Sequence, residues 1–182
     1  MAGSTRGAHG DAVRADLEQV FRACYPRVVA VAARVLGTRD EAEDVAQEVF
    51  LSFGRSSVPA DEAPAWLSVA AAHRALNQLR SGRRRTDREL RAVTPEASHP
   101  GAASSAAPDV AETVVGRDER RQVREALGRL PHKQAVALVL RHSGLSYAEV
   151  ATALDLSPGS VGTTVRRAES ALSKELTHVP PR

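Results

Sequence analysis

The chain has 182 residues, of which 42% are hydrophobic and 3% aromatic, with one cysteine and a net charge of +3. This length suits one large or two small domains, and the scarcity of aromatic residues favours closely packed helices over a β-sandwich. A single cysteine excludes an internal disulfide and a multi-cysteine zinc site. The absence of a long apolar run and of a signal-peptide core predicts a cytoplasmic protein without membrane insertion.

The first half of the sequence predicts a helical domain over residues 11–85. Residues 1–10 are small and polar, and we expect them to form a disordered tail. Helical spacing of apolar residues begins near Asp11, and Pro26 allows a turn or kink before the spacing resumes. Gly37 is expected to close this element, because glycine is the usual residue just beyond a helix end.

Two further helices complete this predicted domain. Thr38 is expected to cap the first, whose apolar residues fall on one face. The second is expected from about Ala65 to Arg80. Cys24 has the spacing of a buried hydrophobic residue, and Trp66 is expected to anchor the core rather than to stack on a base.

Charge is unevenly distributed along this half of the chain. The segment 38–48 holds five carboxylates and one arginine, whereas the segment 73–91 holds seven arginines and two carboxylates. The acidic segment predicts a basic partner, and the basic segment predicts an anionic one.

The second half of the sequence predicts a smaller helical domain over residues 113–176. The segment 86–112 is rich in Ala, Ser, Pro and Gly in its central part, which predicts a flexible linker. Helical spacing then resumes, breaks at Pro131 and continues, and residues 177–182 are expected to form a C-terminal tail.

The stretch 144–172 predicts two helices joined by a tight turn. Ser146 and Glu149 have the spacing of a capping box, and Ser157 followed by Pro158 predicts a second helix start. This layout is that of a helix-turn-helix, whose second helix enters the DNA major groove. An ordinary helical hairpin is the alternative reading of the same pattern.

Three blocks of this sequence, taken in order, resemble the extracytoplasmic-function (ECF) sigma factors of bacterial RNA polymerase. They are AEDVAQEVFL at 42–51, AWLSVAAAHRALNQLRSGRRR at 65–85 and LGRLPHKQAVALVLRHSGLSYAEVATALDLSPGSV at 127–161. The resemblance implies an all-α protein with two helical domains, regions 2 and 4, that is not an enzyme and needs no cofactor or metal. The implied partners are core polymerase, through its β′ clamp helices and β flap, and promoter DNA, with an anti-sigma factor also possible.

The resemblance assigns the acidic helix to the β′ clamp helices. Asp44, Gln47, Glu48 and Leu51 share one helix face because they lie at positions i, i+3, i+4 and i+7. The alternative is that this is an ordinary solvated acidic face.

The resemblance assigns recognition and opening of the −10 element to the basic helix, with the loop 55–62 capturing a flipped base. Basic side chains can hold the phosphates of one strand while an amide can bond a base edge. This sequence departs from the family where Ser68 replaces a frequent aromatic residue and His73 replaces a frequent asparagine. The candidate residues for the −10 element are Arg74, Asn77, Arg80, Arg83, Arg84 and Arg85.

The resemblance assigns the −35 element to the second helix of the helix-turn-helix. Gly162 and Thr164 stand where the family often has basic residues, so its contacts are expected to be unusual or weak. Asp155 replaces a common glycine in the turn, a modest change because aspartate tolerates left-handed geometry. The candidate residues for this element are Ser157, Gly159, Ser160, Thr163, Arg166 and Arg167.

Two other classes of protein are alternatives to the sigma factor. A self-sufficient dimeric helix-turn-helix regulator leaves the acidic helix and the basic segment without a role. An enzyme lacks a site, because the six histidines have no metal-ligand spacing and the sequence has no glycine-rich phosphate loop.

Overall fold

The computed structural model describes residues 16–92 and 114–177, and within these ranges the chain forms helices and no strands. The predicted tail at 1–10, the start of the first helix near Asp11, residues 93–113 and residues 178–182 of the tail predicted at 177–182 lie outside the described residues, and Thr177 is the last residue of a helix. The helices are α1 (Leu17–Leu36), α2 (Arg39–Gly54), α3 (Ala63–Ala92), α4 (Val114–Arg129), α5 (His132–His142), α6 (Tyr147–Leu154) and α7 (Pro158–Thr177).

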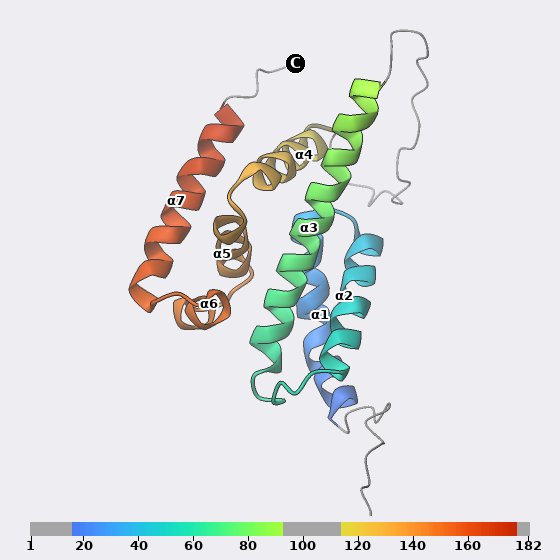
Figure 1. The fold of residues 1–182 in the computed structure, drawn as a ribbon, viewed down its shortest axis with the longest axis vertical. Helices are drawn as coiled ribbons and strands as arrows, with labels where there is room; N and C mark the ends of the chain where they lie inside the picture. The colour runs from blue at the N-terminus through green and yellow to red at the C-terminus, as the bar shows by residue number, and fades with distance from the viewer. Residues whose placement is uncertain (1–15, 93–113, 178–182) are drawn as a thin grey trace, which may run out of the picture.

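Helices α1, α2 and α3 pack together as the first domain, and α4 to α7 form the second (Figure 1). In α1, apolar residues recur at helical spacing from Val20 to Leu36, and Cys24 is buried among them, as its spacing predicted. Burial raises the pKa of the Cys24 thiol. Trp66 packs against the core beside Phe53, with ring centroids 5.9 Å apart, which confirms its predicted role as an anchor.

Two predicted boundaries differ from the structure. Pro26 lies inside α1 without ending it, so the chain does not make the predicted turn there. Gly37 then ends α1 as predicted, with a left-handed φ of 86° and a backbone N–H that donates to the Ala33 carbonyl. Helix α3 continues to Ala92, past Arg85 where the first domain was expected to end, so residues 86–92 of the predicted linker are helical.

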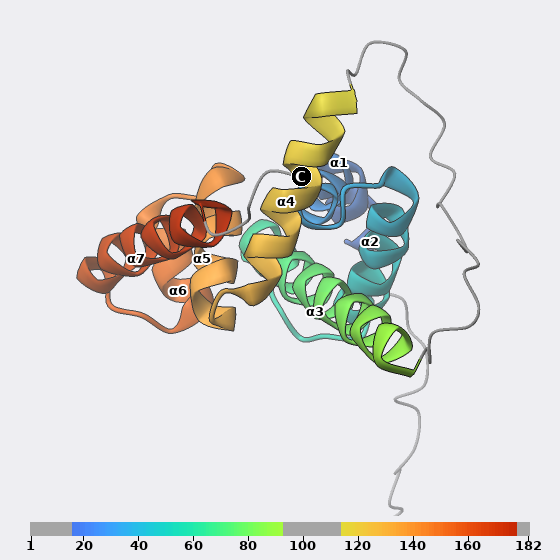
Figure 2. The ribbon, with the colours of Figure 1, turned by 90° about the horizontal axis from the view of Figure 1, so that it is seen from above.

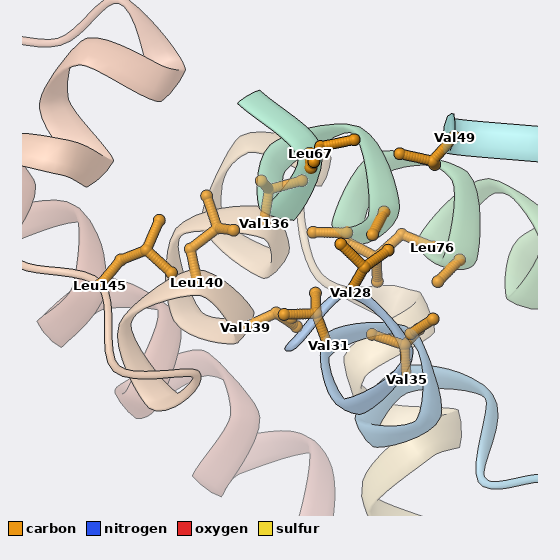
Figure 3. Packing of buried hydrophobic residues seen from close by; sticks show 14 of the residues in the cluster. Val28, Val31, Val35, Val49, Leu67, Leu76, Val136, Val139, Leu140 and Leu145 are labelled. Carbon is orange, nitrogen blue, oxygen red and sulfur yellow. The ribbon is translucent and has the colours of Figure 1, made fainter. Parts of the chain in front are cut away.

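Helix α5 lies between the two halves of the molecule (Figures 1 and 2). Six consecutive residues, from Ala135 to Leu140, are buried, because α1 and α3 cover one side of α5 and α6 and α7 cover the other. Figure 3 shows Val136 and Val139 pointing toward Leu67 of α3 and Val31 of α1. The buried apolar residues of both domains therefore form one continuous cluster.

Candidate DNA-binding and protein-binding surfaces

The helix-turn-helix forms as the sequence predicts. The Ser146 hydroxyl accepts from the Glu149 backbone N–H at 3.2 Å, and the Glu149 carboxylate accepts from the Ser146 backbone N–H at 2.6 Å. Asp155 closes α6 in left-handed geometry, with a φ of 50°. The next helix begins at Pro158, so the cap of α6 at Asp155 and the start of α7 at Pro158 together set the angle between the two helices.

Helix α7 turns its apolar side, where Val161 and Val165 are buried, toward the other helices of the second domain. All six residues proposed for the −35 element are exposed. Since successive residues turn by about 100° around an α-helix, Arg167 shares one side with Ser160 and Thr163, and Arg166 lies about 100° away from it. In Figures 1 and 2, α7 lies on the side of α5 away from α3.

The six residues proposed for the −10 element do not form a single surface. Asn77 and Arg84 are exposed along one stripe of α3, whereas Arg74 lies about 60° to 80° around the helix, toward α2. There Arg74 donates to the Glu48 carboxylate at 2.6 Å and to the Ser52 hydroxyl at 2.8 Å. Arg85 is exposed on that same side, and Arg83 is half-buried on the opposite one.

Arg80 is drawn into the contact between the domains. Its guanidinium donates to the carbonyls of Leu130 at 2.6 Å and Gly128 at 3.3 Å, at the C-terminal end of α4. Its Nη1 lies 2.6 Å from Nδ1 of His132, whose Nε2 lies 2.7 Å from Nδ1 of His73. We call His73, Arg80 and His132 the interdomain cluster. Arg80, which was expected to face DNA, thus forms hydrogen bonds with the second domain instead.

A second arginine, from the second domain, contacts the end of a helix in the first domain. Arg124 of α4 lies over Gly37 at the C-terminal end of α1, so close that a Cβ at that glycine would come within 2.5 Å of its guanidinium. Burial is the largest cause of the lowered pKa of Arg124, and the nearby Glu41 raises it in part. Each domain therefore places an arginine at the negative end of a helix of the other domain.

The acidic face of α2 is open. Asp44, Gln47, Glu48 and Leu51 are all exposed, and the Leu51 side chain is 62% accessible. Leu51 thus adds an apolar group to a surface that is otherwise polar and acidic. Glu48 is the member of the set that already has a partner, namely Arg74.

Two residues near the predicted base-capturing loop have structural roles. Ser68 is fully buried, and its hydroxyl donates to the Pro64 carbonyl at 2.7 Å within α3. It therefore cannot present a side chain to a base in this structure. The loop 55–62 itself is short and mostly exposed, with the Ser56 hydroxyl bonded to the Phe53 carbonyl at 2.8 Å.

The sequence reasoning missed His132 and Arg124, and it placed Arg80 on an open surface. The signal for the interdomain contact was present in the segment HKQAVALVLRH. Its uninterrupted apolar run has no polar side, and a helix that is hydrophobic all round is buried on all sides. Within the second domain α6 and α7 cover one side of α5, so its other apolar side needs a second covering layer.

Within residues 16–92 and 114–177, no helix is both long and apolar enough to cross a membrane, and no group of His, Cys, Asp and Glu side chains is placed to hold a metal ion. A helical protein with an accessible helix-turn-helix and a separate acidic and apolar face has the features of a DNA-binding regulator that also binds another protein.

Comparison with known proteins identifies the family. One family model, described as Sigma-70 region 2, matches residues 20–85, and another, described as Sigma-70, region 4, matches residues 120–172. The ECF RNA polymerase sigma factor SigK of Mycolicibacterium vanbaalenii is 31% identical over 169 residues, covering 86% of this chain and 81% of SigK. The chain therefore belongs to the ECF sigma factors, which are not enzymes but direct promoter-specific initiation of transcription by RNA polymerase.

Two other similarities add detail. The ECF RNA polymerase sigma factor SigJ of Mycobacterium tuberculosis is 31% identical over 157 residues, and this chain spans 85% of its own length but 49% of SigJ. A solved structure of the sigma factor RpoE in complex with the anti-sigma factor NepR, from Bartonella quintana, shares the fold with a TM-score of 0.51 at 22% identity, covering 91% of this chain and 99% of RpoE. These similarities do not favour the alternative of a self-sufficient dimeric regulator.

Proposed function

We propose that the acidic face of α2 binds the β′ clamp helices of core polymerase. The observation that carries this proposal is the exposure of Leu51 beside Asp44 and Glu48. Carboxylates around an apolar side chain suit a basic and partly apolar partner, because the charges steer association while burial of the leucine stabilises the complex.

We propose further that α7 reads the −35 element in the major groove and that the exposed stripe of α3 acts on the −10 element. Arg167, with Ser160 and Thr163 on the same side, is placed to reach base edges, and Arg166 is placed to reach a phosphate. On α3, Asn77 and Arg84 are free to meet DNA, and Arg80 becomes free only if α4 and α5 move away from it.

The contact between the domains bears on how this function is regulated. Arg80 is bonded to the second domain, so this arrangement would withhold part of the proposed −10 surface. We propose that polymerase binding favours a separated arrangement, and that a partner that stabilises the packed one acts as an inhibitor. The RpoE structure contains an anti-sigma factor, which supports a partner of this class for the present chain as well. A cytoplasmic location fits all of these partners.

The test is run-off transcription with purified core polymerase and a genomic DNA library, followed by mapping of the start sites. We expect shared −35 and −10 motifs upstream of the start sites only when this protein is added. Reversing the charges of both Asp44 and Glu48 should abolish co-elution with core polymerase in gel filtration without loss of helicity. A protein that binds promoter DNA as a dimer but does not co-elute with core polymerase would contradict the proposal.

A further inference from the structure

The hydrogen bonds of the interdomain cluster fix where its protons lie. A guanidinium can only donate, so Nδ1 of His132 accepts from Arg80 and carries no hydrogen. In the neutral ring the hydrogen is then on Nε2, which donates to Nδ1 of His73 at 2.7 Å. The hydrogen of His73 is therefore on its own Nε2. The chain of bonds from Arg80 through His132 to His73 requires both rings to be neutral.

An additional proton would break this chain at either ring. On Nδ1 of His132 it would point at the Arg80 guanidinium, and on Nδ1 of His73 it would point at the N–H of His132. In both cases a hydrogen bond is replaced by two donors that face each other. The protonated ring also adds a positive charge to that of Arg80. His132 is also the first residue of α5, where the helix dipole opposes a positive charge.

The surroundings give such a proton little compensation. Glu175 of α7 is paired with Arg129 at 3.3 Å, and Glu48 of α2 is paired with Arg74. From α6 and α1, Glu149 and Arg27 influence one another. The charged residues that line the cleft beside His132 are cationic, namely Arg80, Arg83 and Arg84 of α3 and Arg129 of α4. Lys133 adjoins His132 in the chain.

We propose that the interdomain cluster is a pH-dependent latch, closed while His73 and His132 are neutral and opened when either ring takes up a proton. Opening would release Arg80 from the carbonyls of Gly128 and Leu130. A cleft of about 380 Å³, lined by Arg80, Arg84 and His132 among others, gives solvent protons access to the contact. The value of this release for DNA binding rests on the proposed function, but opening itself does not.

The direction of the effect follows from the proton balance. Burial lowers the pKa of His73, and burial, His73 and Arg80, in that order, lower the pKa of His132. In a separated form both rings are in water, with a pKa of about 6.5. The packed form binds fewer protons, so it is favoured above that pH and loses its advantage as the pH falls below it. The ratio of open to packed molecules should rise up to about tenfold per pH unit for each histidine that takes up a proton.

Small-angle X-ray scattering of the full chain between about pH 8 and about pH 5 tests the latch, since histidine titrates in this range and most carboxylates do not. The radius of gyration should rise on acidification while the far-UV circular dichroism stays constant. His73→Gln and His132→Gln should each weaken this dependence, and the double variant should abolish it, whether that variant is open or packed. His142→Gln is the matched control, because His142 is exposed and faces Glu169 within the second domain.

The outcomes separate clearly. An unchanged radius of the parent protein down to about pH 5 overturns the proposal, as does an expansion that the double variant retains or one accompanied by loss of helicity. Histidine side-chain NMR of the parent supplies a second readout, in which the pKa values of His73 and His132 should both lie below about 6.5, the value of a histidine in water. None of these measurements involves polymerase or DNA, so a failure of the latch and a failure of the proposed function are distinguishable.

Discussion

Glu48 and Arg74 were predicted to serve different partners, yet the structure joins them by a hydrogen bond of 2.6 Å. The Glu48 side chain is 63% accessible and the Arg74 side chain 41%, so solvent screens their ion pair and it contributes little to stability. Either residue can exchange this partner for another at small cost. Binding of the acidic α2 face by a basic protein would leave Arg74 available for a phosphate, which links the two proposed surfaces.

We expect Leu51→Ser to weaken binding of core polymerase and to change the free energy of unfolding by less than about 1 kcal/mol, because the side chain is already exposed. Fluorescence titration with core polymerase and urea denaturation measure the two quantities. Tyr147→Ser, at another exposed apolar residue, is the control and should bind normally. Equal affinities of the parent and Leu51→Ser would remove Leu51 from the interface.

Arg167 and Arg166 should differ in how they act on DNA. Arg167→Ala should cost about 1 to 3 kcal/mol at one −35 position and relax the preference there, because this residue lies on the side of Ser160 and Thr163. Arg166→Ala should weaken all promoters similarly and reduce the salt dependence. A matrix of promoter variants measured at two salt concentrations distinguishes these patterns. Parent-like behaviour of both variants would mean that α7 does not read DNA in this way.

At the scale of elements, the sequence predicts most of this fold because its signals are local. The capping box of Ser146, the glycine at position 37 and the apolar spacing of α2 each depend on residues a few positions apart. The surface of α3 could not be predicted in the same way. Its stripe of His73, Asn77 and Arg80 has the pattern of an exposed face, and its partial burial depends on residues more than 45 positions away.

Gly37→Ala should destabilise the protein by about 1 to 2 kcal/mol, because a Cβ is unfavourable at a positive φ and would also displace Arg124. Urea denaturation measures the change. Gly82→Ala is a matched control within α3, where a Cβ meets nothing within 4 Å and should stabilise the helix by up to about 1 kcal/mol. If both variants have the same midpoint of urea denaturation, neither the positive φ of Gly37 nor the nearness of Arg124 restricts the residue at this position.

Ser146→Ala should cost about 1 kcal/mol of folding free energy, because α6 has eight residues and loses a cap that satisfies a backbone donor.

The hydrogen bond from the Ser146 backbone is the largest cause of the lowered pKa of Glu149. The contribution of the Glu149 carboxylate is therefore complete above its ordinary pKa of about 4.3 and is lost as the pH falls through the lowered value. Thermal denaturation of the parent and of Glu149→Ala should show a difference that shrinks below about pH 4. A difference independent of pH would contradict this role of the carboxylate.

At the scale of the whole molecule, the continuous apolar cluster predicts that the two domains unfold together near neutral pH. Trp66, the one tryptophan of the chain, reports on the first domain, and far-UV circular dichroism reports on all helices. Leu145→Ala, at a fully buried site in the second domain, should cost about 2 to 5 kcal/mol and move both transitions by the same amount. A Trp66 transition that stays at the parent midpoint would mean that the domains unfold independently.

The burial of Ala135 to Leu140 in α5 has a consequence for how the protein behaves in concentrated solution. When the domains separate, Val136 and Val139 come into water on one side, and Leu67 and Val31 lose part of their cover on the other. Each uncovered apolar area costs about 25 cal/mol per Å² and can be covered by the matching area of a second molecule. Open molecules that lack a partner should therefore self-associate, whereas packed ones stay monomeric. The contact between the domains would in this way protect solubility as well as withhold Arg80.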